Sequence, residues 1–476
     1  MMKRWIIFLC IGLPLFSWSQ TAEVIVYGGI DQDQFIDVVE WDQGYVVLGF
    51  TSSTENNNSD LILLRYDTDL QLLWQLALGT DGADQAAALA VDNNGNSYVC
   101  GSTSFGENGG YDGYLAKVSP DGDQLWEQSI GDEEWNFGTA LEFHNDVLYM
   151  AIKNFTPDSD NYQSEVTLID LDGNSSQTLA IEGQNDETIT DFLWYQDQLL
   201  VATTVEFSNH TNAELYAFDA DLNPIWNHIM EGTEESSFTS HHLDADAING
   251  IGWSTTQFNH PDYEDTAVVV RFEDNGVFID AYVLPSAGKQ EGTSFIWSND
   301  VMITAFKTNI FGAGGQGIYV ESRINNGIFI SASVFGGGID EYPSRIFEDS
   351  NGRIVIVGNS DSYGLNTVDG YLVRLPNNLI ASNYDLDLTE DVDEVFVGIE
   401  SEYEDHKWNV FPNPAQDRIS IQDLNSPAFY EIINMSGTIV QSGQTNGNIQ
   451  LQLSNGCYFV RIKGVPFTHR LMISNE

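Results

Sequence analysis

The sequence predicts an all-β protein, with a seven-bladed β-propeller followed by a small Ig-like β-sandwich. Three observations lead to this prediction. An apolar, β-rich run with Gly or Ala near its end recurs seven times, at intervals of 50 to 53 residues. Each copy holds short strand-like segments bounded by Gly, Asn and Asp, without a helical period. A separate set of alternating strands occupies residues 408–476.

The chain begins with the features of a secretory signal peptide. Two basic residues precede a twelve-residue apolar run at 5–16, which is too short to span a membrane as a helix. Ser17 and Ser19 then supply the small residues of a cleavage site. We therefore predict a signal peptide over 1–19 and expect no transmembrane segment after its removal.

The repeat predicts the blades of a propeller over residues 20–378. Four strands per copy and seven copies are typical of this architecture. Tryptophans recur at one position of the repeat, which predicts a role in packing between blades: Trp74, Trp126 and Trp226. The anchors of the seven copies are Gly49, Gly101, Ala151, Ala202, Gly252, Ala305 and Gly358.

The closure of the ring is predicted from the segment that opens the mature chain. By spacing, residues 23–29, EVIVYGG, match the third strand of a copy, which runs into the first inner strand of the next copy. We therefore expect this segment to be the outer strand of the last blade, which removes two open sheet edges. Residues 378–383 are an alternative candidate for the same place.

The repeat also carries a resemblance to a known family. Its first copy contains GYVVLG, TSS, LLRYD and a following Trp and Leu-Gly, and this pattern resembles β-propeller repeats of secreted bacterial proteins over roughly residues 23–378. The resemblance implies a fold and no particular activity, because propellers carry many unrelated functions.

The C-terminal part divides into a linker and a domain. We predict an acidic linker over 379–407, since residues 385–405 contain ten acidic side chains and no basic one. In the segment 408–476, FPNP precedes the first strand and a Gly-x-Tyr-Phe-Val strand follows: the motif residues are Phe411, Pro412, Asn413, Pro414, Gly456 and Tyr458. On these residues the segment resembles the type A C-terminal sorting domain of the type IX secretion system.

That resemblance implies a destination. The partners it implies are the type IX secretion translocon and its C-terminal signal peptidase. The expected location is outside the cell or on the outer surface of a Gram-negative bacterium, with the propeller either released or anchored.

Composition excludes several classes of function. The chain has 71 acidic and 17 basic side chains and a formal net charge of −54. Binding to nucleic acid requires Lys and Arg to neutralise phosphates, so we expect no nucleic-acid partner. The two cysteines that remain after signal removal do not form a disulfide framework. We expect a monomer.

No catalytic motif is found in the repeat. The sequence lacks a Gly-x-Ser-x-Gly elbow, a His-Glu-x-x-His zinc helix and a phosphate loop. His241 and His242 are adjacent in an inner strand, where neighbouring side chains point to opposite faces, so we do not expect them to share a metal. We therefore favour a binding protein over an enzyme and predict no cofactor.

Acidic loops nevertheless suggest a cation site. The loops before each inner strand gather on one face of a propeller, where they would form a negative ring. Within it, Asp132, Glu133 and Glu134 are the candidate metal ligands, with Ca²⁺ as the ion, and a solvated acidic surface is the other interpretation. The ring comprises Asp31, Asp33, Asp81, Asp84, Asp132, Glu133, Glu134, Asp186, Glu187, Glu234, Glu235, Glu291, Asp340 and Glu341.

Aromatic side chains on the same face suggest a ligand. Rings that stack on sugar faces, beside amides that bind hydroxyl groups, suit a glycan. A protein ligand, or rings that only cap the ends of the blades, are alternatives. The candidate ligand-binding residues are Phe105, Tyr111, Trp135, Phe155, Tyr162, His260, Tyr263 and Tyr363.

The preferred hypothesis is a secreted or surface-attached propeller that binds a glycan or protein. Two other classes stay open. One is an extracellular polysaccharide-degrading enzyme that uses a pair of loop carboxylates. The other is a structural surface component whose acidic ring is bridged by Ca²⁺.

Overall fold

The computed structural model describes residues 23–375 and 409–473. Its gaps are residues 30, 53–57, 105–109, 182–184, 235, 259–264, 285–289, 309–316, 325–328, 336–338, 363–367, 412–415, 417, 423–427, 435–438, 454–455 and 463–467. The predicted signal peptide, the linker and residues 378–383 lie outside the described residues.

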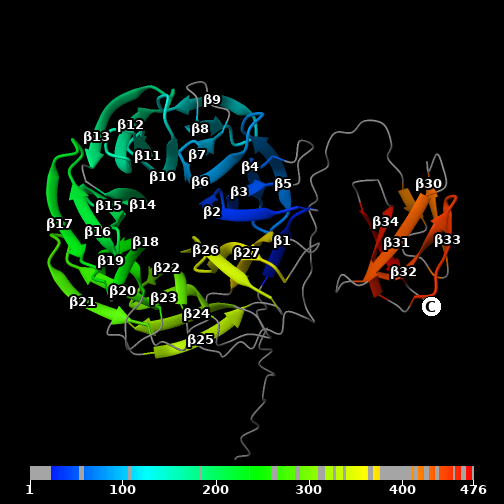
Figure 1. Ribbon diagram of the computed structural model, residues 1–476. Coiled ribbons are helices and arrows are strands. Elements are labelled where there is room, and N and C mark those ends of the chain that lie inside the picture. The colour runs from blue at the N-terminus through cyan, green and yellow to red at the C-terminus, as the bar shows by residue number, and fades with distance from the viewer. Residues whose placement is uncertain are drawn as a thin grey trace, which may run out of the picture.

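Seven four-stranded antiparallel sheets form the propeller, which confirms the predicted fold (Figure 1). In six of them the strands follow each other in sequence from the channel outward. Blade 1 comprises β2 (Asp33–Trp41), β3 (Gly44–Thr51), β4 (Asp60–Tyr66) and β5 (Leu72–Leu78). Blade 2 comprises β6 (Asp84–Val91), β7 (Ser97–Thr103), β8 (Asp112–Val118) and β9 (Gln124–Ile130). Blade 3 comprises β10 (Asn136–His144), β11 (Val147–Thr156), β12 (Asn161–Asp170) and β13 (Ser175–Ile181).

Blade 4 comprises β14 (Asp186–Tyr195), β15 (Gln198–Glu206), β16 (Thr211–Phe218) and β17 (Pro224–Met230). Blade 5 comprises β18 (Ser237–Asp246), β19 (Gly250–Phe258), β20 (Thr266–Phe272) and β21 (Phe278–Val283). Blade 6 comprises β22 (Gln290–Ser298), β23 (Val301–Thr308), β24 (Gly317–Ile324) and β25 (Phe329–Phe335).

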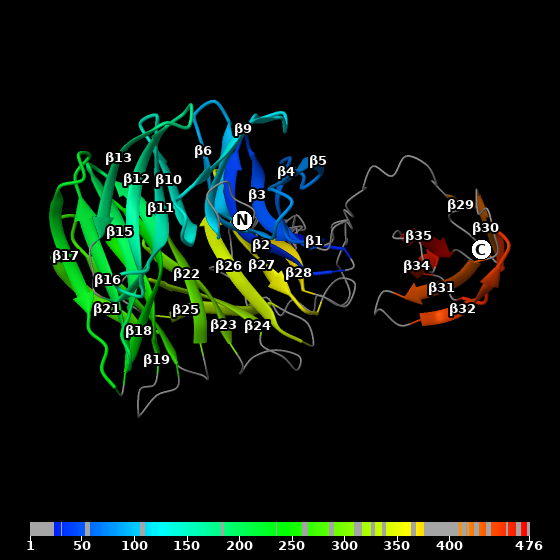
Figure 2. The ribbon, with the colours of Figure 1, turned by 45° about the horizontal axis from the view of Figure 1, so that its top comes forward.

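Blade 7 joins the two ends of the propeller chain. Its strands are β26 (Glu341–Glu348), β27 (Ile354–Ser360), β28 (Asp369–Leu375) and β1 (Glu23–Tyr27). The outer strand β1 pairs antiparallel with β28, with Ile25 opposite Leu372. The dark blue β1 lies beside the yellow β28 in Figure 2. The prediction that the N-terminal segment closes the last blade is therefore confirmed.

The core lies between the blades because both faces of the middle strands are buried. In β3, Val47 belongs to the apolar cluster between blades 7 and 1. Its neighbours Val46 and Leu48 belong to the cluster between blades 1 and 2. A strand that is buried on both faces needs a continuous apolar run, which is the pattern that recurs in each repeat.

The recurring tryptophans pack each outer strand against the next blade. The Trp74 indole N–H donates to the carbonyl oxygen of Pro120 at 2.9 Å, and that of Trp126 donates to the carbonyl oxygen of Leu171 at 3.3 Å. Gly122 has a φ of +88°, and an added Cβ would lie 2.9 Å from the Trp74 ring. For these two tryptophans, the predicted role in blade packing is confirmed.

Every inner strand carries a β-bulge near its first third. The pairing of β2 with β3 shifts between Phe35 and Asp37, and the pairing of β26 with β27 shifts between Pro343 and Arg345. The other five inner strands shift at the equivalent place. A bulge twists a strand and redirects its side chains, so this repeated feature shapes the wall of the central channel.

The C-terminal domain is a two-sheet β-sandwich, as predicted. One sheet contains β29 (Asn409–Phe411), β30 (Arg418–Gln422) and β33 (Asn448–Gln450), and the other contains β32 (Ile439–Thr445), β31 (Ala428–Asn434), β34 (Gly456–Ile462) and β35 (Thr468–Ile473). The two sheets share one apolar core that includes Ile419, Ile432 and Tyr458.

Candidate functional site

The loops that precede the inner strands and those between the second and third strands of each blade lie at one end of the propeller. This follows from the antiparallel order, since each inner strand begins where its partner ends. We call this end the loop face. In blades 2 to 4 its described loop residues are 79–83, 104, 110–111, 131–135, 157–160, 185 and 207–210.

Five rings on the loop face form one aromatic cluster. Tyr111 lies 6.1 Å from Trp135 and 5.4 Å from Phe137, measured between ring centroids. Tyr162 lies 6.2 Å from Phe137 and 5.2 Å from Phe155. The structure thus brings together four of the predicted ligand-binding residues and adds Phe137, which the sequence reasoning missed. Phe105, His260, Tyr263 and Tyr363 lie outside the described residues.

The local backbone presents Trp135 to solvent. The Asp132 carboxylate accepts hydrogen bonds from the Glu134 amide and from the Asn136 side chain, which shapes the turn before β10. The Phe155 amide donates to the Trp135 carbonyl oxygen at 2.8 Å. Gly110 has a φ of +70°, and an added Cβ would lie 2.7 Å from the Trp135 ring. Held in this way, the Trp135 side chain is 50% exposed.

The aromatic cluster continues into a cavity of about 510 Å³, which we call the rim cavity. Phe137 and Tyr162 belong to both. Lys153 also lines the rim cavity, with its Nζ 4.8 Å from the centroid of the Tyr162 ring. The remaining lining residues are Gln85, Ala86, Ala87, Ser102, Gly138, Thr139 and Thr188. The walls therefore combine ring faces, small apolar groups and hydrogen-bonding groups.

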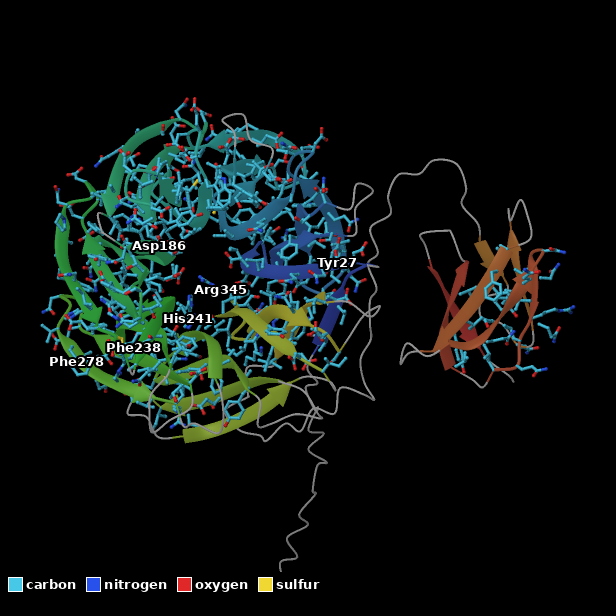
Figure 3. All side chains as sticks on the ribbon, viewed as in Figure 1. Tyr27, Asp186, Phe238, His241, Phe278 and Arg345 are labelled. Atoms are coloured by element: carbon cyan, nitrogen blue, oxygen red, sulfur yellow. The ribbon has the colours of Figure 1, made fainter. Side chains whose placement is uncertain are left out.

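The central channel holds a second cavity of about 600 Å³, walled by the bulged inner strands. Arg345 from blade 7 extends into it, as Figure 3 shows. Its guanidinium lies 3.5 Å from a carboxylate oxygen of Asp191 on blade 4 and 3.8 Å from one of Asp37 on blade 1. His242 on blade 5 donates from Nδ1 to Asp191 at 2.7 Å. This channel cluster therefore links blades that are not neighbours in the ring.

The channel environment changes the ionisation of these groups. Burial raises the pKa of Glu142 to about 8, so this carboxyl group is mostly protonated at neutral pH. Burial lowers the pKa of His241 to about 4, so its ring is neutral. Burial would raise the pKa of Asp191, but Arg345 and the neighbouring histidine lower it below its ordinary value. Burial also raises the pKa of Asp37, against the opposing effect of Arg345. Arg345 therefore faces an ionised Asp191.

The two adjacent histidines bind separate partners. His241 is the extra residue of the bulge in β18, which interrupts the alternation assumed from the sequence. Its Nε2 lies 2.7 Å from the Thr256 hydroxyl group, whereas His242 binds Asp191. Among the described residues, no group of three or more His, Cys, Asp or Glu side chains is arranged to hold a metal ion.

The members of the predicted acidic ring differ in burial. Asp33, Asp84, Glu187 and Glu341 are buried where inner strands begin. Asp84 accepts a hydrogen bond from the Thr80 amide at 2.7 Å, so it holds the preceding turn. Other members are exposed or partly exposed: Asp81, Asp132, Glu133 and Glu234 are exposed, and Asp31, Glu134, Asp186 and Asp340 are partly exposed. The side chains of Glu235 and Glu291 lie outside the described residues. Binding of Ca²⁺ by Asp132, Glu133 and Glu134 stays a prediction.

The sequence also contains a signal for the channel cluster. When the inner strands are aligned on their bulges, Asp37, Asp191, His242 and Arg345 occupy one register position. Blades 2 and 3 carry alanine there, and blade 6 carries Ser294. Ionisable residues of both signs at one buried register position indicate a mutual interaction across the channel.

Comparison with known families identifies the C-terminal domain. Residues 409–473 match the family described as the secretion system C-terminal sorting domain. This is a type IX secretion sorting domain. Residues 74–106 match the family described as a β-propeller repeat. The protein is therefore a propeller carried to the cell surface or extracellular space by the type IX secretion system.

The sorting motif lies partly within described residues. Phe411 ends β29, Gly456 begins β34, and Tyr458 is buried in the core of the sandwich. Pro412, Asn413 and Pro414 lie outside the described residues. No described segment forms a helix that is long and apolar enough to cross a membrane. The predicted signal peptide stays a prediction.

Several solved structures are similar to this chain at low sequence identity. The Dos1 propeller is 14% identical with a TM-score of 0.46, over 77% of this chain and 81% of that one. The polysaccharide lyase Uly1 is 8% identical with a TM-score of 0.46, over 74% and 90%. An acylaminoacyl peptidase from Pyrococcus horikoshii is 10% identical with a TM-score of 0.44, over 82% of this chain and 57% of the peptidase. Such values carry no argument about function. No curated protein matches the sequence significantly.

Proposed function

We propose that the protein is a secreted, glycan-binding propeller that binds its ligand on the loop face, at the aromatic cluster and the rim cavity. The observation that supports this proposal is a continuous path of rings. It begins at the half-exposed Trp135, passes through Tyr111 and Phe137, and ends at Tyr162 in the cavity wall.

The chemistry of the cavity suits a carbohydrate. The apolar faces of sugar rings stack on aromatic side chains, and their hydroxyl groups need hydrogen-bonding partners. Gln85, Ser102, Thr139 and Thr188 provide amide and hydroxyl groups in the lining of the rim cavity. A pocket that combines apolar walls with a few polar groups is the usual form of a small-ligand site.

The test is binding of the mature protein to a glycan array, followed by calorimetry on the glycans that bind. We expect Trp135→Ala to weaken binding by about tenfold or more, since half-exposed aromatic anchors carry much of the binding energy. The matched control is Phe278→Ala, because Phe278 is a 56% exposed aromatic residue on the outer edge of blade 5 (Figure 3).

Three outcomes contradict the proposal. The first is the absence of glycan binding. The second is an equal loss of glycan affinity in the Trp135→Ala and Phe278→Ala variants. The third is turnover of a polysaccharide by the wild-type protein. Turnover would favour the enzyme alternative.

A further inference from the structure

The rim cavity differs in charge from the rest of this acidic protein. The chain has 71 acidic and 17 basic residues. Among the described residues that line the rim cavity, Lys153 is the one charged side chain. A cavity with a cation and without carboxylates in its walls is therefore an exception in this molecule, and it favours an anionic group in a ligand.

The position of Lys153 in the repeat strengthens this contrast. In blade 3, Lys153 pairs with Phe137 of the inner strand. In five other blades the equivalent residue, defined by the same pairing relative to the bulge, is uncharged: Phe50 in blade 1, Ser102 in blade 2, Thr204 in blade 4, Thr256 in blade 5 and Asn359 in blade 7. In blade 6 it is Lys307, which pairs with Glu291. The fold of a blade therefore does not require a lysine here.

The surroundings of Lys153 do not neutralise its charge. Within the part of the chain that the structure describes, Lys153 forms no salt bridge, and its contact is the face of Tyr162. Asp186, which accepts a hydrogen bond from the Tyr162 amide at 2.7 Å, does not line the cavity. A half-buried ammonium group without a carboxylate partner gains more from a bound anion than an exposed one does.

We propose that Lys153 binds the anionic substituent of an acidic sugar, a carboxylate or a sulfate ester, and makes the protein prefer acidic over neutral glycans. This inference rests on the proposed function, because the sugar ring lies on Tyr162 and Phe137 of the same cavity. The rings bind the apolar face of the sugar, and Lys153 selects for its charge.

The experiment compares matched pairs of glycans on the mature protein by calorimetry. One pair is oligogalacturonates and their methyl esters, and the other is sulfated galactan oligosaccharides and their desulfated forms. We expect the acidic member of at least one pair to bind about tenfold more tightly, and this advantage to shrink as NaCl is raised from about 50 to about 500 mM. The pair that shows the advantage identifies the substituent.

Variants separate charge from packing. Lys153→Gln is expected to remove the advantage of the acidic glycan and to leave the affinity for its neutral partner within about twofold. Lys153→Arg keeps the positive charge and is expected to retain most of the advantage. Lys307→Gln is the matched control, since Lys307 occupies the equivalent position in blade 6, with its Nζ 3.9 Å from the centroid of the Tyr342 ring of blade 7, and does not line the cavity.

The outcomes distinguish this inference from the proposed function. Equal affinity of the wild-type protein for acidic and neutral partners overturns the role of Lys153 and leaves glycan binding intact. An unchanged acidic preference in Lys153→Gln, with an unchanged melting temperature, also overturns it. If no glycan binds, the proposed function fails and the inference fails with it.

Discussion

The closing strand offers a direct test of how the ring is held together. Ile25 lies at the centre of β1, is 2% exposed, and packs in the cluster between blades 7 and 1. β1 begins the propeller chain and pairs with β28, the last strand of the propeller in the sequence. We predict that Ile25→Ala destabilises the whole propeller.

The expected magnitude follows from the buried volume that is lost. The substitution removes three carbon atoms, and each buried methylene group contributes about 0.8 kcal/mol, which amounts to roughly 2.4 kcal/mol. The cavity left behind adds to this loss, because the surrounding blades relax only in part. The free energy of unfolding should therefore fall by about 3 kcal/mol, within the usual range of about 2–5 kcal/mol for such substitutions.

The assay is urea unfolding of the mature protein, followed by tryptophan fluorescence. The matched control is Ile225→Ala, since Ile225 is 53% exposed on the outer strand β17. Its substitution should change the free energy of unfolding by less than about 0.5 kcal/mol. Equal effects of the two substitutions would refute the reasoning. The reasoning would also be refuted if Ile25→Ala left the free energy of unfolding of the propeller unchanged and only loosened β1.

Three further predictions concern other parts of the molecule. Burial and a neighbouring glutamate raise the pKa of Glu187 from 4.5 to about 8. Its folded-state pKa exceeds the unfolded value, so stability should decline as pH rises from about 4.5 to about 8, and Glu187→Gln should make melting temperature less dependent on pH in that interval. Arg345→Met leaves Asp191 and Asp37 without their cation. We expect the free energy of unfolding in urea to fall by about 2 kcal/mol, less than for a fully buried pair, because the Arg345 side chain is 34% exposed. The double variant Arg345→Met with Asp191→Asn should lose less free energy of unfolding than Arg345→Met alone, and additive losses would contradict the link across the channel. Deletion of residues 409–473 should leave the propeller inside the cell envelope, because the sorting domain is lost. Detection of the truncated propeller in the medium by immunoblot would show that the sorting domain is dispensable.

Much of the fold was predictable because each blade is encoded locally. The strands of one blade are consecutive in the chain, and its apolar runs and turns recur with a constant spacing. The closing strand was predicted from spacing, because residues 23–29 match the third strand of a copy, with residues 378–383 as the alternative.

The site was predictable only in part. Tyr111, Trp135, Phe155 and Tyr162 were identified because the repeat assigns their segments to one face, although Phe155 and Tyr162 lie at the ends of β11 and β12 and not in a loop as expected. The rim cavity was not predictable, since its walls come from three blades and Lys153 looks like an ordinary strand residue until Phe137 and Tyr162 are placed around it.

By itself, the sequence determined the number of blades and the route out of the cell, because each depends on residues that are close together or on a repeated pattern. The tertiary structure decided which strand closes the ring and which side chains meet in the channel. Arg345 and His242 are 103 positions apart and lie side by side in the channel. Their contact exists only once the ring is closed, because the bulged inner strands then direct side chains from distant blades into one narrow space.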